Sequence, residues 1–458
     1  MSDGANVMYQ MCNIDTNIDP GRSSSSSLDR AHMASLHSIN AVESDKAKVG
    51  RILAACRHRH LGALRELAAS EHGLIDDELR RTAWPLLLGC NDQAASEHDD
   101  WTCLARHRDE EQVQLDVNRS FVYYPQSSSH RHRQHIPVIT LTPRAPDECE
   151  QRVRERKREL SHVITATLRR HPVLCYFQGY HDIIQLLLLV LGAEAATAAA
   201  ARLSLLRIRD FMLPTLTAAE AHLHLLPSIL CAADPHLYNH LSRATQPTPF
   251  FALAATLTLY AHDVEEYRDI ARLFDYLLAS EPVVPLYLFA TIVLSRKREL
   301  LEIDHDEPDM LHSILSKLPK PLHLERLIHR TQTLFTTYPP EQLPNRAWRR
   351  VSSYSVLKTT RDPHALSTQT LQEGERLFAK QAAEIQRQHA VKQVRQRMQA
   401  LAYQYRRPAK WTGTAILVAA LALYLGRTTN ASVALGYLTS VARRLSHVAW
   451  DVARTFAP

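Results

Sequence analysis

Long runs rich in leucine and alanine recur through this chain, while only 12 of its 458 residues are glycine. Glycine is disfavoured inside helices because of its backbone entropy, so a helical protein contains little of it. Stretches with the alternating, β-branched pattern of strands are few. The sequence therefore predicts an all-α fold, in which one large multi-helix domain is followed by a long basic helix and a C-terminal membrane helix.

The boundaries of the large domain follow from where helical spacing begins and lapses. Residues 1–45 are polar, rich in serine and without apolar periodicity, so we expect a disordered N-terminal tail. Helical spacing begins with Ile52, and the domain is predicted over residues 46–345. Several prolines fall within residues 125–150, where we expect a loop insertion because proline interrupts helices.

Four further segments are predicted beyond the domain. Residues 346–370 are polar and irregular, which is typical of a linker, and residues 371–408 are predicted to form a basic helix ending at Pro408. Residues 411–426 carry no charge and are predicted to be a transmembrane anchor, although their 16 residues span only about 24 Å. A buried or surface helix is the alternative for that segment. Residues 427–458 are predicted to be a C-terminal tail.

Composition excludes several classes of function. The net charge of +6 is modest, and the basic residues are not interleaved with aromatics along a recognition helix, so no nucleic-acid partner is expected. The seven cysteines form no CxxC pair, and no metal is predicted. The histidines at 130–135 fit a solvated loop better than a metal site. No phosphate-binding loop of the Walker type occurs, so no nucleotide or other cofactor of its own is expected.

Three short motifs occur in order in the first half of the helical region. They are LRRTAWPLLLG at 79–89, VQLDVNRS at 113–120 and YFQGYHDI at 176–183. Taken alone, Trp84 suits a buried helix face. Asp116 and Arg119, at positions i and i+3, suit a surface ion pair, and the Gln-Gly step of the third motif suits a turn. Only the three motifs together, in this order, indicate a function.

Jointly, the motifs resemble the signature of TBC domains, the all-helical catalytic domains of Rab GTPase-activating proteins. The matching residues are Arg81, Trp84 and Pro85 in the first motif, Val113, Asp116 and Arg119 in the second, and Tyr176, Gln178, Gly179 and Ile183 in the third. Val113 stands where the family pattern has isoleucine. The resemblance continues through RDFMLPTL at 209–216, HDVEEYRDIARLFDYLLASEPVVPLYLFATIVL at 262–294 and FTTYPPEQL at 335–343, so it covers roughly residues 50–345.

The resemblance implies a GTPase activator that completes a partner's active site and is not an enzyme alone. By position, Arg119 is implied as an arginine finger and Gln178 as a glutamine finger. Asp116 would hold the approach of Arg119 or anchor the local backbone, and Gly179 would let the backbone approach the partner because it lacks a Cβ. The other implied supporting residues are Tyr176, Arg81 and Trp84. The implied partner is a Rab small GTPase in its GTP-bound form, which carries the GTP and the magnesium ion.

The later stretches and the C-terminal apolar segment look most like the branch of the family anchored in the endoplasmic reticulum membrane. That resemblance implies a role in early secretory transport. The basic residues Arg406, Arg407 and Lys410 before the predicted anchor favour a domain facing the cytosol, although the basic residues after it leave the mitochondrial outer membrane open. Two other functions remain open: a non-catalytic scaffold that binds a Rab, and a membrane-surface adaptor acting through the basic helix at 371–405. The identity of the Rab does not follow from the sequence.

Overall fold

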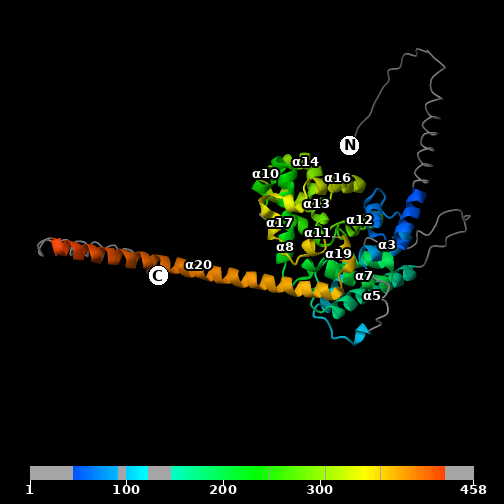
Figure 1. The fold of residues 1–458 in the computed structure, drawn as a ribbon, viewed down its shortest axis with the longest axis horizontal. Coiled ribbons are helices and arrows are strands. Elements are labelled where there is room, and N and C mark those ends of the chain that lie inside the picture. Colours follow the sequence, from blue (N-terminus) through cyan, green and yellow to red (C-terminus); the bar gives the residue numbers. More distant parts are fainter. Residues whose placement is uncertain are drawn as a thin grey trace, which may run out of the picture. The chain divides into compact units, whose positions relative to one another are not determined.

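The computed structural model describes residues 45–90, 100–121, 146–246, 248–304, 306–361 and 363–428. Within these ranges every regular element is an α-helix or a short 3-10 helix, and no strand occurs (Figure 1). The all-α prediction is therefore confirmed for the described residues. Three predicted segments lie wholly or largely outside them, namely the tail at 1–45, the loop insertion at 125–150 and the tail at 427–458.

The chain divides into two compact units, Met1–Gln381 and Ala382–Pro458. A first helix covers residues 45–57. The elements that follow are α2 (Leu61–Ala69), α3 (Asp77–Leu87), η2 (Trp101–Cys103), α4 (Glu110–Asn118), α5 (Pro146–Arg170), α6 (Tyr180–Leu191), α7 (Ala193–Leu206), η4 (Arg209–Met212), α8 (Thr217–Leu223), α9 (Leu225–Ala233), α10 (Pro235–Ala244), η5 (Phe250–Ala252), α11 (Leu253–Leu257), α12 (Tyr267–Ala279), α13 (Val284–Ser295), α14 (Lys297–Leu301), α15 (Pro308–Leu315), α16 (Leu324–Thr337), η6 (Pro340–Gln342), η7 (Pro344–Arg346), α17 (Ala347–Arg350), α18 (Val356–Thr359), α19 (Pro363–Thr368) and α20 (Leu371–Thr428).

Helix α13 forms the centre of one half of the first unit. Its residues from Val284 to Val293 are all buried, and it packs against α9, α11 and α16. A helix that is apolar on nearly every side is stable in water only when other elements cover it all round. Pro285 is tolerated in its first turn because the amides there have no partner within the helix.

Helix α6 has the same role in the other half, where α3, α5 and α7 pack against it and α5 lies beside α7 (Figure 1). Nine of its 12 residues are buried. Each large apolar side chain contributes about 1.5–3 kcal/mol when fully buried. The helix begins after Gly179, with φ of 99°, and ends at Gly192, with φ of 79°. Both values favour glycine, so the helix start next to the third motif is fixed by the backbone.

The first motif contributes to the core through Asp275 of α12. The Asp275 carboxylate is completely buried, and it accepts hydrogen bonds from Trp84 Nε1 at 2.8 Å, Arg80 Nη2 at 2.9 Å and the Leu74 amide at 3.0 Å. A buried carboxylate is tolerated when it is paired and hydrogen-bonded, as this one is. Trp84 is itself completely buried, which confirms the helix-face prediction.

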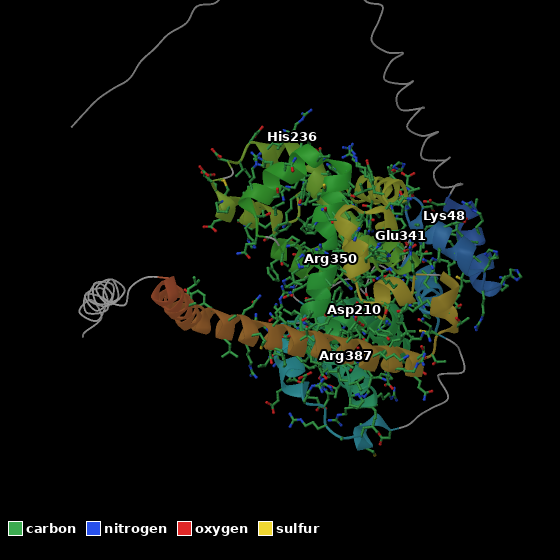
Figure 2. All side chains as sticks on the ribbon, turned by 60° about the vertical axis from the view of Figure 1, so that its left-hand side comes forward. Lys48, Asp210, His236, Glu341, Arg350 and Arg387 are labelled. Atoms are coloured by element: carbon green, nitrogen blue, oxygen red, sulfur yellow. The ribbon has the colours of Figure 1, made fainter. Side chains whose placement is uncertain are left out.

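Residues 346–370, predicted to be a linker, are instead packed into the first unit. They contain α17, α18 and α19, and Val356 and Leu357 are each 1% exposed. Asp210, which lies among the helices (Figure 2), accepts hydrogen bonds from the Val356 amide at 3.1 Å and from the Ser355 hydroxyl. The linker prediction was wrong because Val356 and Leu357 are only two adjacent apolar residues, which show no helical periodicity. In addition, the Asp210 carboxylate that binds this segment is far away in the sequence.

The first unit also includes the beginning of α20. Phe378 and Gln381 are buried, and Glu375 Oε1 lies 2.7 Å from the Nδ1 atom of His171 at the end of α5. A Cβ atom at Gly374 would lie only 2.9 Å from Leu205 Cβ, so α20 and α7 approach closely there. The packed domain therefore extends well beyond residue 345, where the sequence predicted its end.

In the second unit, α20 continues to Thr428, past Pro408, where its end was predicted. Proline costs a helix one backbone hydrogen bond and about 3 kcal/mol, and here it does not end the helix. Nowhere in the described part of the chain is a helix both long and apolar enough to cross a bilayer, so the predicted anchor at 411–426 is not supported. The uncharged run between Lys410 and Arg427 is shorter than the ~20 residues that a span requires.

Candidate functional site

Arg119 caps the C-terminal end of α4, and its side chain is 64% exposed. Its guanidinium forms an ion pair with Asp116, one helical turn earlier. Val113 and Val117 on the same helix are completely buried. Helix α4 is thus held by its apolar face, while the second motif presents a long cation to solvent.

The carboxylate of Asp116 joins the second motif to the third. It is completely buried; Oδ1 accepts hydrogen bonds from Gln112 Nε2 at 3.1 Å and from the Arg119 guanidinium, and Oδ2 accepts one from the Tyr176 hydroxyl at 2.9 Å. Burial and the nearby Asp116 charge raise the pKa of Tyr176 far above its usual range. The hydroxyl therefore keeps its proton and acts as the donor in this contact.

Gln178 lies in the short segment between α5 and α6, two residues after Tyr176. The Tyr176 amide donates a hydrogen bond of 2.9 Å to Asp109 Oδ2, which fixes the segment from the α4 side. The Gln178 side chain is exposed and has no hydrogen-bond partner among the described residues. A side chain with free donor and acceptor groups therefore projects from a segment whose two ends are anchored.

Gly179 is required by contacts within the protein itself. It is buried, its φ is 99°, and a Cβ atom there would lie 2.6 Å from Thr258 Cγ2. The resemblance implied that this glycine lets a partner's backbone approach, which stays a prediction. The structure adds a reason within the protein itself, because any side chain at this position would collide with Thr258 and strain the left-handed turn that starts α6.

A second link between α4 and α6 was missed in the sequence analysis. Gln185 is 4% exposed, and its Oε1 accepts a hydrogen bond of 3.0 Å from the amide of Phe121, two residues after Arg119. Phe121 has φ of 64°, which is uncommon for a residue other than glycine. A single polar residue inside the apolar run of α6 was the available signal, because buried polar groups need partners.

Three further polar side chains extend the network, and they were also missed. His181 Nδ1 lies 3.3 Å from the Tyr176 hydroxyl, His181 Nε2 lies 3.3 Å from Asp182 Oδ1, and Asp182 Oδ2 lies 2.9 Å from His262 Nδ1. Burial lowers the pKa of His181, whereas the hydrogen bond to Asp182 raises the pKa of His262. His181 and Asp182 stand within the third motif, and His262 begins the stretch at 262–294 that resembles the family, but no pattern assigned His262 to the site.

The first motif lies away from this network. Arg81 Nε donates a hydrogen bond of 3.1 Å to the carbonyl of Val190, close to the C-terminal end of α6. Val190 follows Tyr180 by ten residues, which is about 15 Å along a helix. Trp84 is bound to Asp275 in the core. Of the predicted site residues, the structure brings Asp116, Arg119 and the Tyr176–Gly179 segment together and leaves Arg81 and Trp84 elsewhere.

Arg119 and Gln178 are both exposed, so the arrangement presents one cation and one neutral amide to solvent. No group of three or more histidine, cysteine, aspartate and glutamate side chains that could hold a metal occurs in the described ranges. The histidines at 130–135 lie outside those ranges.

Comparison with known proteins assigns the chain to a family. Residues 77–301, which include all three motifs, match the family model described as the Rab-GTPase-TBC domain. The chain is 36% identical over 304 residues to TBC1 domain family member 20 of Bos taurus, covering 66% of this chain and 70% of that protein. It is 36% identical over 287 residues to the Homo sapiens protein of the same name, covering 63% and 66%. It is 32% identical over 331 residues to GTPase-activating protein gyp10 of Schizosaccharomyces pombe, covering 70% and 80%. The residues matched to the family model include Asp116, Arg119 and the segment Tyr176–Gly179, which together form the α4–α6 site. The similarity also extends over most of each relative, and the chain therefore belongs to the Rab-GTPase-TBC domain family.

Proposed function

We propose that this protein is a GTPase-activating protein for a Rab-family small GTPase and that it completes the partner's active site with Arg119 and Gln178. The observation that carries the proposal is the buried Asp116 carboxylate, which binds both Arg119 and Tyr176. It links the two segments from which the exposed side chains project. Membership of the family supports the proposal, as does the fission-yeast relative, which is named as a GTPase-activating protein.

Arg119 would stabilise the charge that develops during GTP hydrolysis. The transition state carries negative charge on the oxygens of the transferred phosphoryl group, so catalysis depends mainly on positioning and charge stabilisation. A guanidinium stays protonated at every physiological pH, and its planar donors can bind two oxygens at once. Since Arg119 is mostly exposed, it can reach into a partner without a change in the fold of α4.

Gln178 would orient the attacking water. A carboxamide can accept a hydrogen bond from water through its oxygen and donate one to a phosphoryl oxygen through its nitrogen. Many GTPases use a glutamine of their own for this purpose. In the proposed complex, Gln178 takes that role from outside, and its lack of a partner among the described residues leaves both groups available.

The buried contacts behind the two side chains would keep the segments that carry them in place before the partner arrives. Asp116, Tyr176 and Gln185 are fixed by hydrogen bonds between α4, α6 and the segment that joins α5 to α6. Side chains held in this way need little reorganisation when the reaction occurs, which is where much of the catalytic effect of such groups arises. The protein would need no cofactor, because the Rab brings both GTP and magnesium.

The early secretory pathway, with the endoplasmic reticulum as the membrane concerned, remains the proposed place of action. Its support is the sequence resemblance alone, and the mitochondrial outer membrane is the other possibility. The Rab that responds decides between them, because each Rab is confined to particular membranes. A response restricted to a Rab of another compartment would contradict this part of the proposal.

The proposal is tested with the full chain in a single-turnover GTP-hydrolysis assay against every Rab of the host. We expect one or a few closely related members to be stimulated by on the order of 10³-fold or more, as other arginine fingers achieve. An equilibrium binding measurement with each GTP-loaded Rab is made in parallel. A Rab that binds tightly without faster hydrolysis would show a non-catalytic scaffold and contradict the proposed activity.

A further inference from the structure

The part of α20 that belongs to the second unit has an exposed apolar stripe. Its residues are Val391, Val394, Met398 and Leu401, and each is 47 to 63% exposed. At about 100° per residue, the four fall within an arc of about 80° on one side of the helix, along about 15 Å of its length. Single exposed apolar residues are ordinary, but a row at helical spacing marks a surface that binds something.

Cations surround the stripe, and acidic residues are absent. Seven lysines and arginines and no aspartate or glutamate occur between residues 385 and 410. On an ideal helix, Arg395 lies about 40° beyond one edge of the stripe and Arg397 about 40° beyond the other. Both are exposed, and Figure 2 shows side chains standing out along α20 from Arg387 onward. This face of α20 therefore combines an apolar centre with a positively charged border.

A second copy of α20 is a poor fit to this stripe. A two-stranded coiled coil needs an apolar seam repeated over three or four heptads. In this spacing, the seam position before Val391 is Arg387, and the two seam positions after Leu401 are Tyr405 and Pro408. The apolar seam therefore covers less than three heptads. The flanking arginines would also face a helix without a single acidic residue in the same stretch, so no interhelical ion pair could offset their repulsion.

We propose that residues 387–401 of α20 form an interfacial helix that lies flat on an anionic membrane surface. The apolar stripe would enter the boundary between headgroups and acyl chains, while Arg395 and Arg397 extend along its edges to the lipid phosphates. Lipid headgroups supply the negative charge that this face lacks, and a bilayer supplies the apolar layer. The surface goes beyond the GTPase-activating proposal and does not depend on it, because none of its residues belongs to the α4–α6 site.

The test is sedimentation of the full chain with vesicles of phosphatidylcholine containing about one third phosphatidylserine, beside vesicles of phosphatidylcholine alone. We expect binding to the anionic vesicles to be stronger by on the order of 100-fold or more, and to weaken as salt is raised because ions screen the attraction. The variant K392Q/R395Q/R397Q should lose about fivefold in anionic-vesicle binding for each cation, so on the order of 100-fold in total. The variant V391Q/V394Q/M398Q/L401Q should lose binding to both kinds of vesicle.

Matched variants separate this face from the rest of the chain. R152Q/R154Q/R158Q removes the same charge from exposed positions of α5, and Y403S removes an exposed aromatic residue from the opposite side of α20; both should bind vesicles as the wild type does. All variants should keep their helical circular dichroism and any Rab stimulation in solution, so failure of one proposal is distinguishable from failure of the other. Equal binding of wild type and K392Q/R395Q/R397Q to anionic vesicles would overturn the inference. Concentration-dependent dimerisation that V391Q/V394Q/M398Q/L401Q abolishes would overturn it in favour of a second copy.

Discussion

The hydroxyl of Tyr176 donates a hydrogen bond of 2.9 Å to the completely buried carboxylate of Asp116. The two residues are 60 positions apart in the chain. Through this contact, the segment that carries Gln178 is bound to the helix that carries Arg119. In this way the two segments that carry the exposed side chains are held against each other.

Replacing Tyr176 by phenylalanine should lower both stability and activity. The change leaves Oδ2 of a buried carboxylate without its donor, which should lower the free energy of unfolding by about 1–3 kcal/mol. Looser placement of Arg119 should reduce stimulated GTP hydrolysis by up to about 100-fold. Urea unfolding and single-turnover hydrolysis measure the two effects. Tyr238→Phe, at a partly exposed tyrosine of α10, is the matched control, and equal behaviour of both variants would contradict the prediction.

Arg119→Ala should remove most of the stimulation of the responsive Rab, by a factor on the order of 10³ to 10⁵. Arg119→Lys should be nearly as damaging, because lysine keeps the charge and loses the planar pair of donors. Arg106→Ala changes another arginine, 63% exposed and close to α4, and should leave the rate unchanged. If the alanine variant at 119 keeps more than about a tenth of the stimulation, another residue is the finger.

Gln178→Ala should abolish hydrolysis by a Rab whose own switch glutamine has been changed to leucine. The wild-type protein should still stimulate that Rab, because Gln178 would replace the missing side chain. Since Gln178 is exposed, its replacement should shift stability by no more than about 0.5 kcal/mol in a melting curve. Gln114→Ala, at an exposed glutamine of α4, serves as the control. An unfolded Gln178 variant, or an intact rate on the leucine-bearing Rab, would count against the glutamine finger.

Leu357→Ala should destabilise the domain by about 2–5 kcal/mol, because Leu357 is 1% exposed and its truncation leaves a cavity. A residue in a true linker would show a change within about 0.5 kcal/mol. Arg349→Ala, at an exposed position of α17 nearby, should show only that small effect. Chemical denaturation of the two variants distinguishes a packed segment from a linker, and equal midpoints would mean that residues 346–370 do not belong to the core.

The pH dependence of stability should reveal the ion pair between His262 and Asp182. The hydrogen bond to Asp182 raises the pKa of His262 above its ordinary value of 6.5. The stabilisation of the folded state by this ion pair is therefore fully present below about pH 6.5, and it is lost as pH rises through the raised pKa of His262. Burial lowers the pKa of His181, so the contribution of His181 to stability has the opposite pH dependence. His181 is present both in the wild type and in the His262 variant, so its contribution does not enter their difference.

The measurement is the difference in unfolding free energy between the wild type and His262→Gln from about pH 5 to about pH 9. We expect the wild type to be the more stable protein at the acidic end and the difference to shrink toward the alkaline end. When Asp182→Asn is added to a protein that already carries His262→Gln, the pH dependence that this pair contributes to the unfolding free energy should not change further. A difference that is flat across the range would show that the pair contributes nothing.

Much of the fold could be predicted because its signals are local. The apolar run that became α6 and the burial of Trp84 follow from side chains a few residues apart. The grouping of Asp116, Arg119 and the segment around Gln178 was also expected, though only through resemblance to a family. The finger roles of Arg119 and Gln178 remain predictions, since no geometry without a bound partner tests them.

Other features depend on which elements meet in three dimensions, and the sequence carried no sign of them. Position 179 must be glycine because Thr258 leaves no room for a Cβ atom there. Asp210 accepts hydrogen bonds from Ser355 and from the Val356 amide, which are about 145 positions away in the sequence. Helical periodicity and capping describe only neighbours within a few turns, so they specify where helices form and which face is apolar. Partners for buried polar groups are chosen by the packing of distant helices. For that reason the sequence was sufficient for an all-helical chain with its three motifs in order, while the extent of the domain to residue 381 and the contacts behind Arg119 depended on the tertiary structure.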